Sequence, residues 1–378
     1  MAKEIPIQNL YYLLCYAWDQ LAEGALIDLK ASDSKSLSEL FARVLAHGTQ
    51  HLVKRGFDRG YLVHSEETAR LRGRFNLSAS MQRLSWRQGR MFCEFDELDH
   101  NILHNRILKT TIGDVLRAGG IEKNTRVLLR EQASTLRHID SIHLTSGIFR
   151  RVHLHRNNRF YRFLLNVCEL IHDSKLPEQQ DGRARFRDFV RDPKRMPYLF
   201  ESFVKNFYAR EQKEFKVGRA QFRWAATGDD ESLAVLPVMK TDVSLRSQNR
   251  SILMDCKFYA EAMSGWLGGE KLHAANLYQL YAYLRNAEHH DAWKGSEGIL
   301  LYPAVSGEFD YQFVVDGHRI KVASIDLDLA WQKIHQGLLS VISPGGFHLS
   351  QTAATAFEDF PGLASSKTAL AADTSEML

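Results

Sequence analysis

Two aspartates and a lysine lie within Leu236–Tyr259, a stretch in which two strand-like runs flank the polar turn Arg246–Arg250. Asp242 falls in the first run, and Asp255 and Lys257 fall in the second. This pattern predicts a hairpin with one well-buried strand. Side chains two residues apart leave the same face of a strand, so Asp255 and Lys257 are expected to lie side by side. A buried strand seldom carries such charges unless they are paired or bound to metal, because each desolvated charge costs several kcal/mol.

These three side chains can support hydrolysis of a phosphodiester. Asp242 and Asp255, on adjacent strands, can converge on one divalent cation, and Mg²⁺ is favoured because it prefers oxygen ligands. Lys257 can orient or help to deprotonate a metal-bound water, and it can offset the charge that builds up on a phosphate under attack. The pattern is short, so a simple Asp–Lys ion pair at a strand end remains the alternative interpretation.

Two predicted helices add candidates to this group. Gln279 and Tyr283 stand four residues apart on one face of the helix expected over Asn276–Leu284. A Gln-x-x-x-Tyr helix after such a motif resembles the RecB-like branch of the PD-(D/E)xK nucleases, in which that helix packs beside the metal site. Upstream, Tyr198–Tyr208 has the apolar spacing of an amphipathic helix. Glu201 on this helix is a candidate further carboxylate, and a solvated helix-face role is its alternative.

Composition describes an ordinary globular protein. The chain has 378 residues, of which 44% are hydrophobic and 25% charged, which is sufficient for two domains and a sizeable core. Its net charge of +4 is too mild to identify a nucleic-acid partner. The four cysteines have no CxxC spacing, which is typical of reduced cytosolic thiols. Without a signal peptide or a membrane-spanning run, the expected location is cytoplasmic.

The segment Phe149–Phe163 is basic and aromatic, and it contains no acid. Arginines neutralise nucleic-acid phosphates whatever the base sequence, so DNA contact is one interpretation. A protein interface or a salt-bridged helix face is the other. The candidate DNA-binding residues are Arg150, Arg151, Arg156, Arg159 and Arg162.

Several elements can be predicted from local patterns. The opening Ile5–Trp18 is expected to form a short strand that turns into a buried helix. A helix is expected over Leu37–Val53, with Ser36 as its N-cap. A hairpin turn is expected at Asp316–Arg319, and a last amphipathic helix over Trp331–Ile342.

The chain lacks a G-x-x-x-x-G-K-[ST] loop for nucleotide phosphates. It also lacks a helix-turn-helix or zinc-finger pattern for reading bases. A nuclease with this equipment would need a partner for targeting and energy.

From Ile5 to about Ile342 the chain resembles the McrC family, the nuclease subunits of McrBC modification-dependent restriction systems. The resemblance rests on motifs in the family's order: IPIQNLYYLLCYAWD at the start, LRGRF at Leu71–Phe75, NRILK at Asn105–Lys109, HLTSGIF at His143–Phe149, RFYRF at Arg159–Phe163 and NLYQLYAYL at Asn276–Leu284.

The resemblance implies that Asp242, Asp255 and Lys257 are the nuclease triad, with both aspartates as Mg²⁺ ligands. It implies cleavage of double-stranded DNA carrying modified cytosine, together with a hexameric AAA+ GTPase, McrB, which binds the GTP. In the family the N-terminal half projects into the ring and stimulates GTP hydrolysis. The basic turn Arg72-Gly73-Arg74 thereby becomes a candidate partner contact, and a solvated hairpin is its alternative.

The expected fold is α+β. A mixed helical and β-hairpin N-terminal region, residues 1–145, would contact the GTPase. A basic connecting segment, residues 146–195, would lead to a restriction-endonuclease-like PD-(D/E)xK α/β domain at 196–342. Residues 343–378 are rich in small and polar residues and are expected to be a disordered tail.

Two classes of function remain open at this point. The chain is either a Mg²⁺-dependent endonuclease subunit, or a non-catalytic adaptor and GTPase activator whose nuclease-like domain only binds DNA. A stand-alone nuclease that cuts without partner or GTP is a weaker third possibility.

Overall fold

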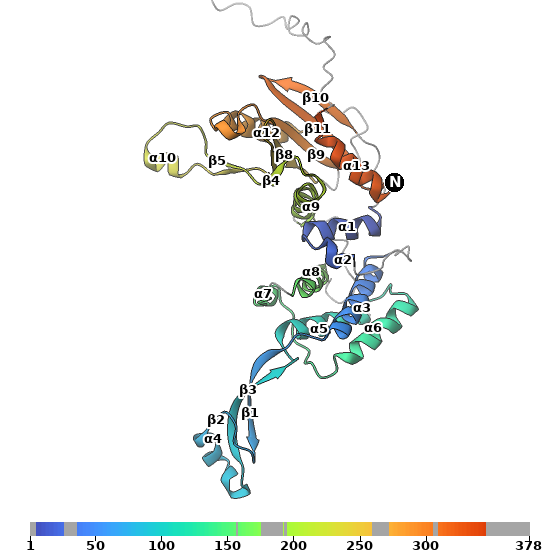
Figure 1. Cartoon of the computed structure of the whole chain (residues 1–378), viewed down its shortest axis with the longest axis vertical. Coiled ribbons are helices and arrows are strands. Elements are labelled where there is room, and N and C mark those ends of the chain that lie inside the picture. The colour runs from blue at the N-terminus through green and yellow to red at the C-terminus, as the bar shows by residue number, and fades with distance from the viewer. Residues whose placement is uncertain are drawn as a thin grey trace, which may run out of the picture.

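The computed structural model describes residues 5–25, 36–155, 158–174, 192, 195–258, 272–304 and 309–344. The molecule is elongated, with a helical body between a projecting β-hairpin and a mixed β-sheet (Figure 1). The chain combines many helices with a mixed parallel and antiparallel sheet, so the predicted α+β class is confirmed. Within the described ranges, no helix has the length and apolarity needed to cross a bilayer.

The helical body forms because apolar residues recur at helical spacing along each of its segments. The predicted N-cap of its longest helix is confirmed, since the Ser36 hydroxyl accepts a hydrogen bond from the amide of Glu39. The buried Glu39 carboxylate in turn accepts from the Thr125 hydroxyl of a neighbouring helix. The helices are α1 (Ile7–Ala17), α2 (Leu21–Gly24), α3 (Leu37–Arg55), α5 (Leu103–Arg117), α6 (Lys123–Thr135), α7 (Ser146–Arg150) and α8 (Arg159–Ser174).

The projecting hairpin pairs β1 (Gly60–Thr68) with β3 (Met91–Asp99) in antiparallel register. The short β2 (Arg74–Phe75) pairs with the other side of β3. Between β2 and β3 the chain forms α4 (Leu77–Gln82) and the 3-10 turn η1 (Ser85–Gln88), at the far end of the projection in Figure 1. Large apolar side chains are exposed here, namely Tyr61, Val63, Leu71, Phe75, Leu77, Met81, Leu84, Trp86 and Leu98.

One polar cluster fastens both ends of the hairpin to the body. The hydroxyl of Tyr161 on α8 accepts a hydrogen bond from the amide of Asp58 (2.9 Å) and donates to Oδ1 of Asn105 on α5 (2.8 Å). The Asn105 side-chain amide donates to the carbonyls of Asp58 and His100. Those two residues lie just before β1 and just after β3. The NRILK and RFYRF motifs therefore hold the hairpin at its base.

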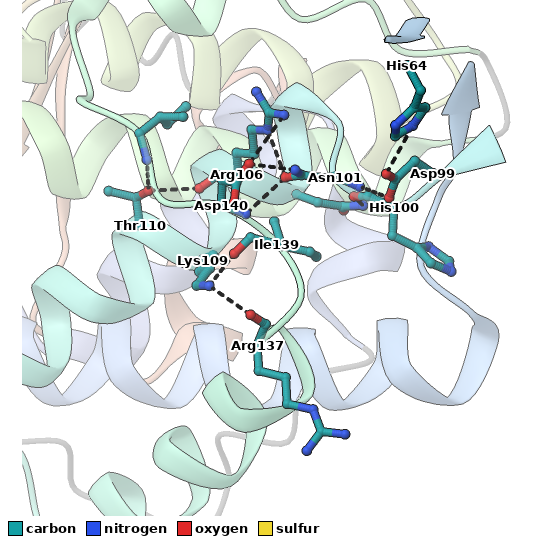
Figure 2. A network of polar contacts seen from close by, with 12 residues as sticks. His64, Asp99, His100, Asn101, Arg106, Lys109, Thr110, Arg137, Ile139 and Asp140 are labelled. Atoms are coloured by element: carbon teal, nitrogen blue, oxygen red, sulfur yellow. Dashed lines mark hydrogen bonds and ion pairs between the residues drawn. The ribbon is translucent and has the colours of Figure 1, made fainter. Parts of the chain in front are cut away.

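Further contacts of the NRILK motif lie beside this base (Figure 2). Asn101 receives a hydrogen bond from Arg106 and donates one to the Asp140 carboxylate (2.6 Å). The Lys109 ammonium contacts the carbonyls of Arg137 and Ile139. These contacts tie the segment after α6 to α5. The NRILK residues therefore have a structural role here.

The six-stranded sheet has the order β10-β11-β9-β8-β7-β4. β8, β9 and β11 run parallel, and the remaining neighbours are antiparallel. A separate two-stranded ribbon pairs β5 with β6 and carries α10 (Asp230–Ala234). The strands are β4 (Lys216–Gly218), β5 (Gln221–Phe222), β6 (Met239–Lys240), β7 (Val243–Arg246), β8 (Ser251–Cys256), β9 (Glu297–Ala304), β10 (Asp310–Val315) and β11 (His318–Asp326).

Helices cover both faces of this sheet. Ile252 and Met254 of β8 belong to one hydrophobic core with α9 (Arg195–Glu211) and α13 (Trp331–Val341). The intervening Leu253 belongs to a second core with α12 (Ala274–Ala287), which precedes the 3-10 turn η3 (Asp291–Trp293). Because strand side chains alternate between faces, Asp255 shares the face of Leu253 and points to the side of α12.

Some local predictions were confirmed and some were wrong. The β7–β8 and β10–β11 hairpins form as expected. Ile5 and Pro6 form no strand before α1. The first strand-like run of Leu236–Tyr259 does not form one continuous strand, because the chain leaves β6 and bends at Asp242 before β7 begins. The tail predicted over 343–378 lies outside the described residues beyond Pro344.

The expected domain boundaries cut across two packing contacts. α1 packs against α9, and the Asn9 side-chain amide donates to the carbonyls of Leu327 and Leu329 (2.8 Å each). α8, within the expected connecting segment 146–195, packs instead among the helices of the body. One continuous hydrophobic core consequently extends from Ile5 to Ile342.

Candidate active site

The two aspartates come together at one end of the β7–β8 pair. The register pairs Val243 with Met254, which brings Asp242 opposite Asp255. Asp242 occupies the bend before β7, and its Oδ2 accepts a hydrogen bond from the amide of Cys256 (2.8 Å). Asp255 is only 1% exposed. The β7–β8 register thus brings these two carboxylates together, as the sequence predicted.

The Asp255 carboxylate is buried with unused hydrogen-bonding capacity. Neither of its oxygens accepts a hydrogen bond of good geometry from the described residues, although Lys257 Nζ lies 2.9 Å from Oδ2 as an ion pair. Burial, reinforced by the charge of Asp242 and opposed by Lys257, raises its pKa to about 6. Burial also raises the pKa of Asp242, against the amide of Cys256. Buried carboxylates with hydrogen-bonding capacity to spare fit the ligand preference of a hard divalent cation.

Lys257 follows β8 directly and is held by the two predicted residues of α12. Its Nζ donates to Gln279 Oε1 (2.9 Å), and Gln279 Nε2 donates to the Tyr283 hydroxyl (2.7 Å). The Tyr283 hydroxyl donates to the carbonyl of Lys240 (2.9 Å). This chain of hydrogen bonds fixes the ammonium next to Asp255, so Gln279 and Tyr283 position Lys257.

Glu201 reaches the same group from α9. Burial, together with the charge of Asp242, raises its pKa to about 7. Arg219 Nη2 lies 3.3 Å from Glu201 Oε2, and Arg219 Nε donates to the carbonyl of Asp242 (3.2 Å). Sequence reasoning did not find Arg219, since a single arginine between two short strands carries no recognisable pattern.

In the described part of the chain, no group of three or more His, Cys, Asp or Glu side chains is arranged as a metal site. Asp242 and Asp255 are the pair that could hold a cation, and Glu201 beside them is paired with Arg219. A two-carboxylate site suits Mg²⁺, which usually keeps several waters in its coordination shell.

The predicted partner-contacting residues lie on the projecting hairpin, away from the aspartates. The Arg72 guanidinium lies 3.9 Å from the centre of the Phe95 ring and pairs with Glu66 (2.6 Å). Gly73 has a φ of +65°, and a Cβ added there would lie 2.2 Å from the carbonyl oxygen of Glu94. Glycine is therefore required at this turn. Arg74 is exposed on β2.

The predicted DNA-binding arginines belong to the helical body. Arg150 is exposed at the end of α7, Arg151 follows it, and Arg159 and Arg162 are exposed on α8. Arg156 lies outside the described residues. The structure does not bring these arginines to the carboxylate group, and Figure 1 draws α7 and α8 on the opposite side of α9 from the sheet.

Paired carboxylates and a lysine on a mixed sheet with flanking helices are the arrangement of a PD-(D/E)xK-like site. Residues 4–303 match the family described as "McrBC 5-methylcytosine restriction system component". The chain belongs to this family.

Two comparisons agree with that membership. The chain is 31% identical over 338 residues to the "Type IV methyl-directed restriction enzyme EcoKMcrBC" of Escherichia coli (strain K12), covering 89% of this chain and 97% of the relative. Its fold is similar, with a TM-score of 0.54 and 21% identity, to a chain in a structure described as a half-complex of Thermococcus gammatolerans McrB AAA+ hexamers with bound McrC. That match covers 89% of this chain and 76% of the other.

Proposed function

We propose that this chain is the endonuclease subunit of a modification-dependent restriction complex, and that it hydrolyses phosphodiesters of double-stranded DNA with Mg²⁺. The observation that carries the proposal is the buried Asp255 carboxylate beside Asp242, for which the Lys257 ammonium at 2.9 Å is the one polar partner among the described residues. The relative's description as a methyl-directed restriction enzyme supports DNA carrying modified cytosine as substrate. A complex acting on DNA that enters the cell would work in the cytoplasm.

Each residue has a defined part in this proposal. Asp242 and Asp255 would hold the cation, which when bound supplies a Lewis acid and an activated water. Lys257 places a positive charge where charge builds up on the phosphate. Gln279 and Tyr283 keep the Lys257 ammonium in position through their hydrogen bonds. Glu201, whose pKa is raised to about 7, would act as an acid or base beside them.

The projecting hairpin supports the second half of the proposal, which is a complex with an McrB-like AAA+ GTPase hexamer. The fold relative is bound to such hexamers, and this hairpin exposes apolar side chains next to Arg72, Gly73 and Arg74. Exposed apolar patches of this kind mark protein interfaces. We expect the hairpin to contact the ring and to stimulate GTP hydrolysis. Arg150, Arg151, Arg159 and Arg162 would contact the DNA backbone.

Replacement of Asp255 by Asn tests the nuclease function. We expect cleavage of methylated DNA by the reconstituted complex with GTP to fall at least about 100-fold, because a cation ligand is lost. Stimulation of the partner's GTPase should be retained, since the hairpin is unchanged. Cleavage equal to that of the wild type would favour the adaptor function instead. Cleavage without partner or GTP would identify a stand-alone nuclease.

A further inference from the structure

Arg219 stands where the edge of the sheet gives way to the β5–β6 ribbon. It follows β4 directly and precedes β5 by one residue. β4 pairs with β7 up to Gly218 and Ser244, so Arg219 emerges beside the bend that carries Asp242. The ribbon holds this position, because the amide of Ala220 donates to Thr241 Oγ1 (3.0 Å) and the amide of Thr241 donates to the Ala220 carbonyl (3.0 Å).

Among the described residues, the guanidinium of Arg219 has contacts along one edge. Its Nε donates to the carbonyl of Asp242, and its Nη2 contacts Glu201 at 3.3 Å. A guanidinium carries five N–H donors, so those that remain are available to another anion. The side chain is 40% exposed, whereas Lys257 is 18% exposed and Asp255 1% exposed. Arg219 is therefore the cation of this group that a DNA strand can reach most easily.

The formal charges of the group favour an additional anion once a cation is bound. Glu201, Asp242 and Asp255 carry three negative charges, and Lys257 and Arg219 carry two positive charges. One divalent cation would leave a surplus of one positive charge, and a single phosphodiester would cancel it. Arg219 forms only a weak, half-exposed pair with Glu201, which makes it the cation that can transfer to the phosphate at least cost.

We propose that Arg219 is a phosphate-binding residue of the active site, which leaves Glu201 for the DNA backbone when a divalent cation neutralises the carboxylates. This inference rests on the proposed nuclease function. Arginine suits the role because its planar fork matches phosphate oxygens.

Arg219→Gln in the full-length chain tests this role with two binding measurements. With Ca²⁺ as a cation, we expect affinity for a duplex of arbitrary sequence to fall about tenfold. The slope of log affinity against log salt should fall by about one, as expected for one lost phosphate contact. Calorimetric binding of Ca²⁺ in the absence of DNA should be no weaker than in the wild type, because a competing positive charge has been removed. Arg219→Lys should keep the wild-type salt slope.

Arg246→Gln is the matched control. Arg246 is an exposed arginine at the other end of β7, where it lies against the Trp293 ring. We expect wild-type binding of both Ca²⁺ and DNA. Equal DNA binding by Arg219→Gln and the control would overturn the inference. A loss of both Ca²⁺ and DNA binding in Arg219→Gln would also overturn it, because the site would then be disrupted as a whole. The inference would be wrong as well if DNA binding by the wild type did not depend on Ca²⁺.

The nuclease function and the role of Arg219 can fail separately. If the complex containing Asp255→Asn cuts DNA, the nuclease function itself is wrong. If that complex is inactive while Arg219→Gln binds DNA with wild-type affinity and salt slope, only the role of Arg219 is wrong.

Discussion

At the scale of single residues, the candidate site holds buried carboxylates that are costly to ionise, and a bound cation would lower that cost. Asp242, Asp255 and Glu201 all have pKa values raised by burial, and the charge of Asp242 further raises the pKa values of Asp255 and Glu201. An ordinary pair of carboxylates in a protein core would be satisfied by donors. Here, among the described residues, Asp255 has the ion pair to Lys257 as its one polar contact. We therefore expect a bound divalent cation to stabilise this arrangement.

This cost predicts how stability depends on pH. The pKa of Asp255 is about 6 in the folded protein, above its ordinary value of 3.8. Because the folded state holds this proton more tightly, its stabilising contribution is complete below about pH 4 and is lost as pH rises through about 6. Two pKa units correspond to at most about 3 kcal/mol. In chelator, the wild type should therefore lose more free energy of unfolding between pH 4 and 7 than Asp255→Asn does.

Denaturant unfolding at several pH values measures the difference. Addition of Mg²⁺ at pH 7 should raise the melting temperature of the wild type but not that of Asp255→Asn. Parallel pH profiles for the two proteins would contradict the raised pKa of Asp255.

At the scale of elements, the strands at the two ends of the molecule differ in burial. In the sheet, β8 is buried on both faces and carries Asp255 near its end. In the hairpin, β1 and β3 are partly exposed and depend on Asn105 and Tyr161 for their attachment to the body. The contacts at its base therefore set the orientation of the hairpin, and of its exposed surface, relative to the body. The turn of the hairpin requires glycine at position 73, because the φ is positive and an added Cβ would lie 2.2 Å from the Glu94 carbonyl oxygen.

Gly73→Ala tests whether this turn serves the partner. The added Cβ would collide with the Glu94 carbonyl and shift the pairing of β2 with β3. We expect stimulation of the partner's GTPase to fall about tenfold or more, while the melting temperature of the chain changes little, because the turn lies outside the core. Gly89→Ala is a matched control, since Gly89 also has a positive φ but nothing within 4 Å of the added Cβ. Equal GTPase stimulation by both variants would argue against a role for the turn.

At the scale of the whole molecule, α1 couples the helical body to the sheet. It packs against α9, where the Asn206 side-chain amide donates to the Tyr16 carbonyl. The Asn9 side-chain amide donates to the carbonyl of Leu327, just after β11. Residues from both parts belong to one continuous core. We therefore expect the described parts of the chain to unfold together.

Asn9→Ala tests this coupling. It removes two hydrogen bonds from a side chain that is 7% exposed and leaves two carbonyls without this donor, which should cost about 2–3 kcal/mol. Calorimetry should show one transition that moves to lower temperature as a whole. Two transitions, of which only one moves, would mean that the body and the sheet unfold independently.

The sequence by itself determined the local elements and the candidate triad. Apolar residues that repeat every 2 residues indicate a strand, and those that repeat every 3.6 residues indicate a helix. Because these repeats involve residues close in sequence, the β7–β8 hairpin, α9 and α12 could be predicted. The spacing of Asp255 and Lys257 placed both on one strand face, and four-residue spacing placed Gln279 and Tyr283 on one helix face. The family motifs indicated the family of the chain, although they did not show which contacts their residues make.

Only the tertiary structure decided which distant residues meet. Arg219 comes to Glu201 and Asp242 because β4 pairs with β7, and no local pattern records that pairing. Asn105 and Tyr161 join at the base of the hairpin in the same way, from two helices. The physical reason is that periodicity encodes which face of an element is buried, whereas contacts between elements depend on how those faces pack together. The site's charge balance, and with it the role proposed for Arg219, arises from that packing.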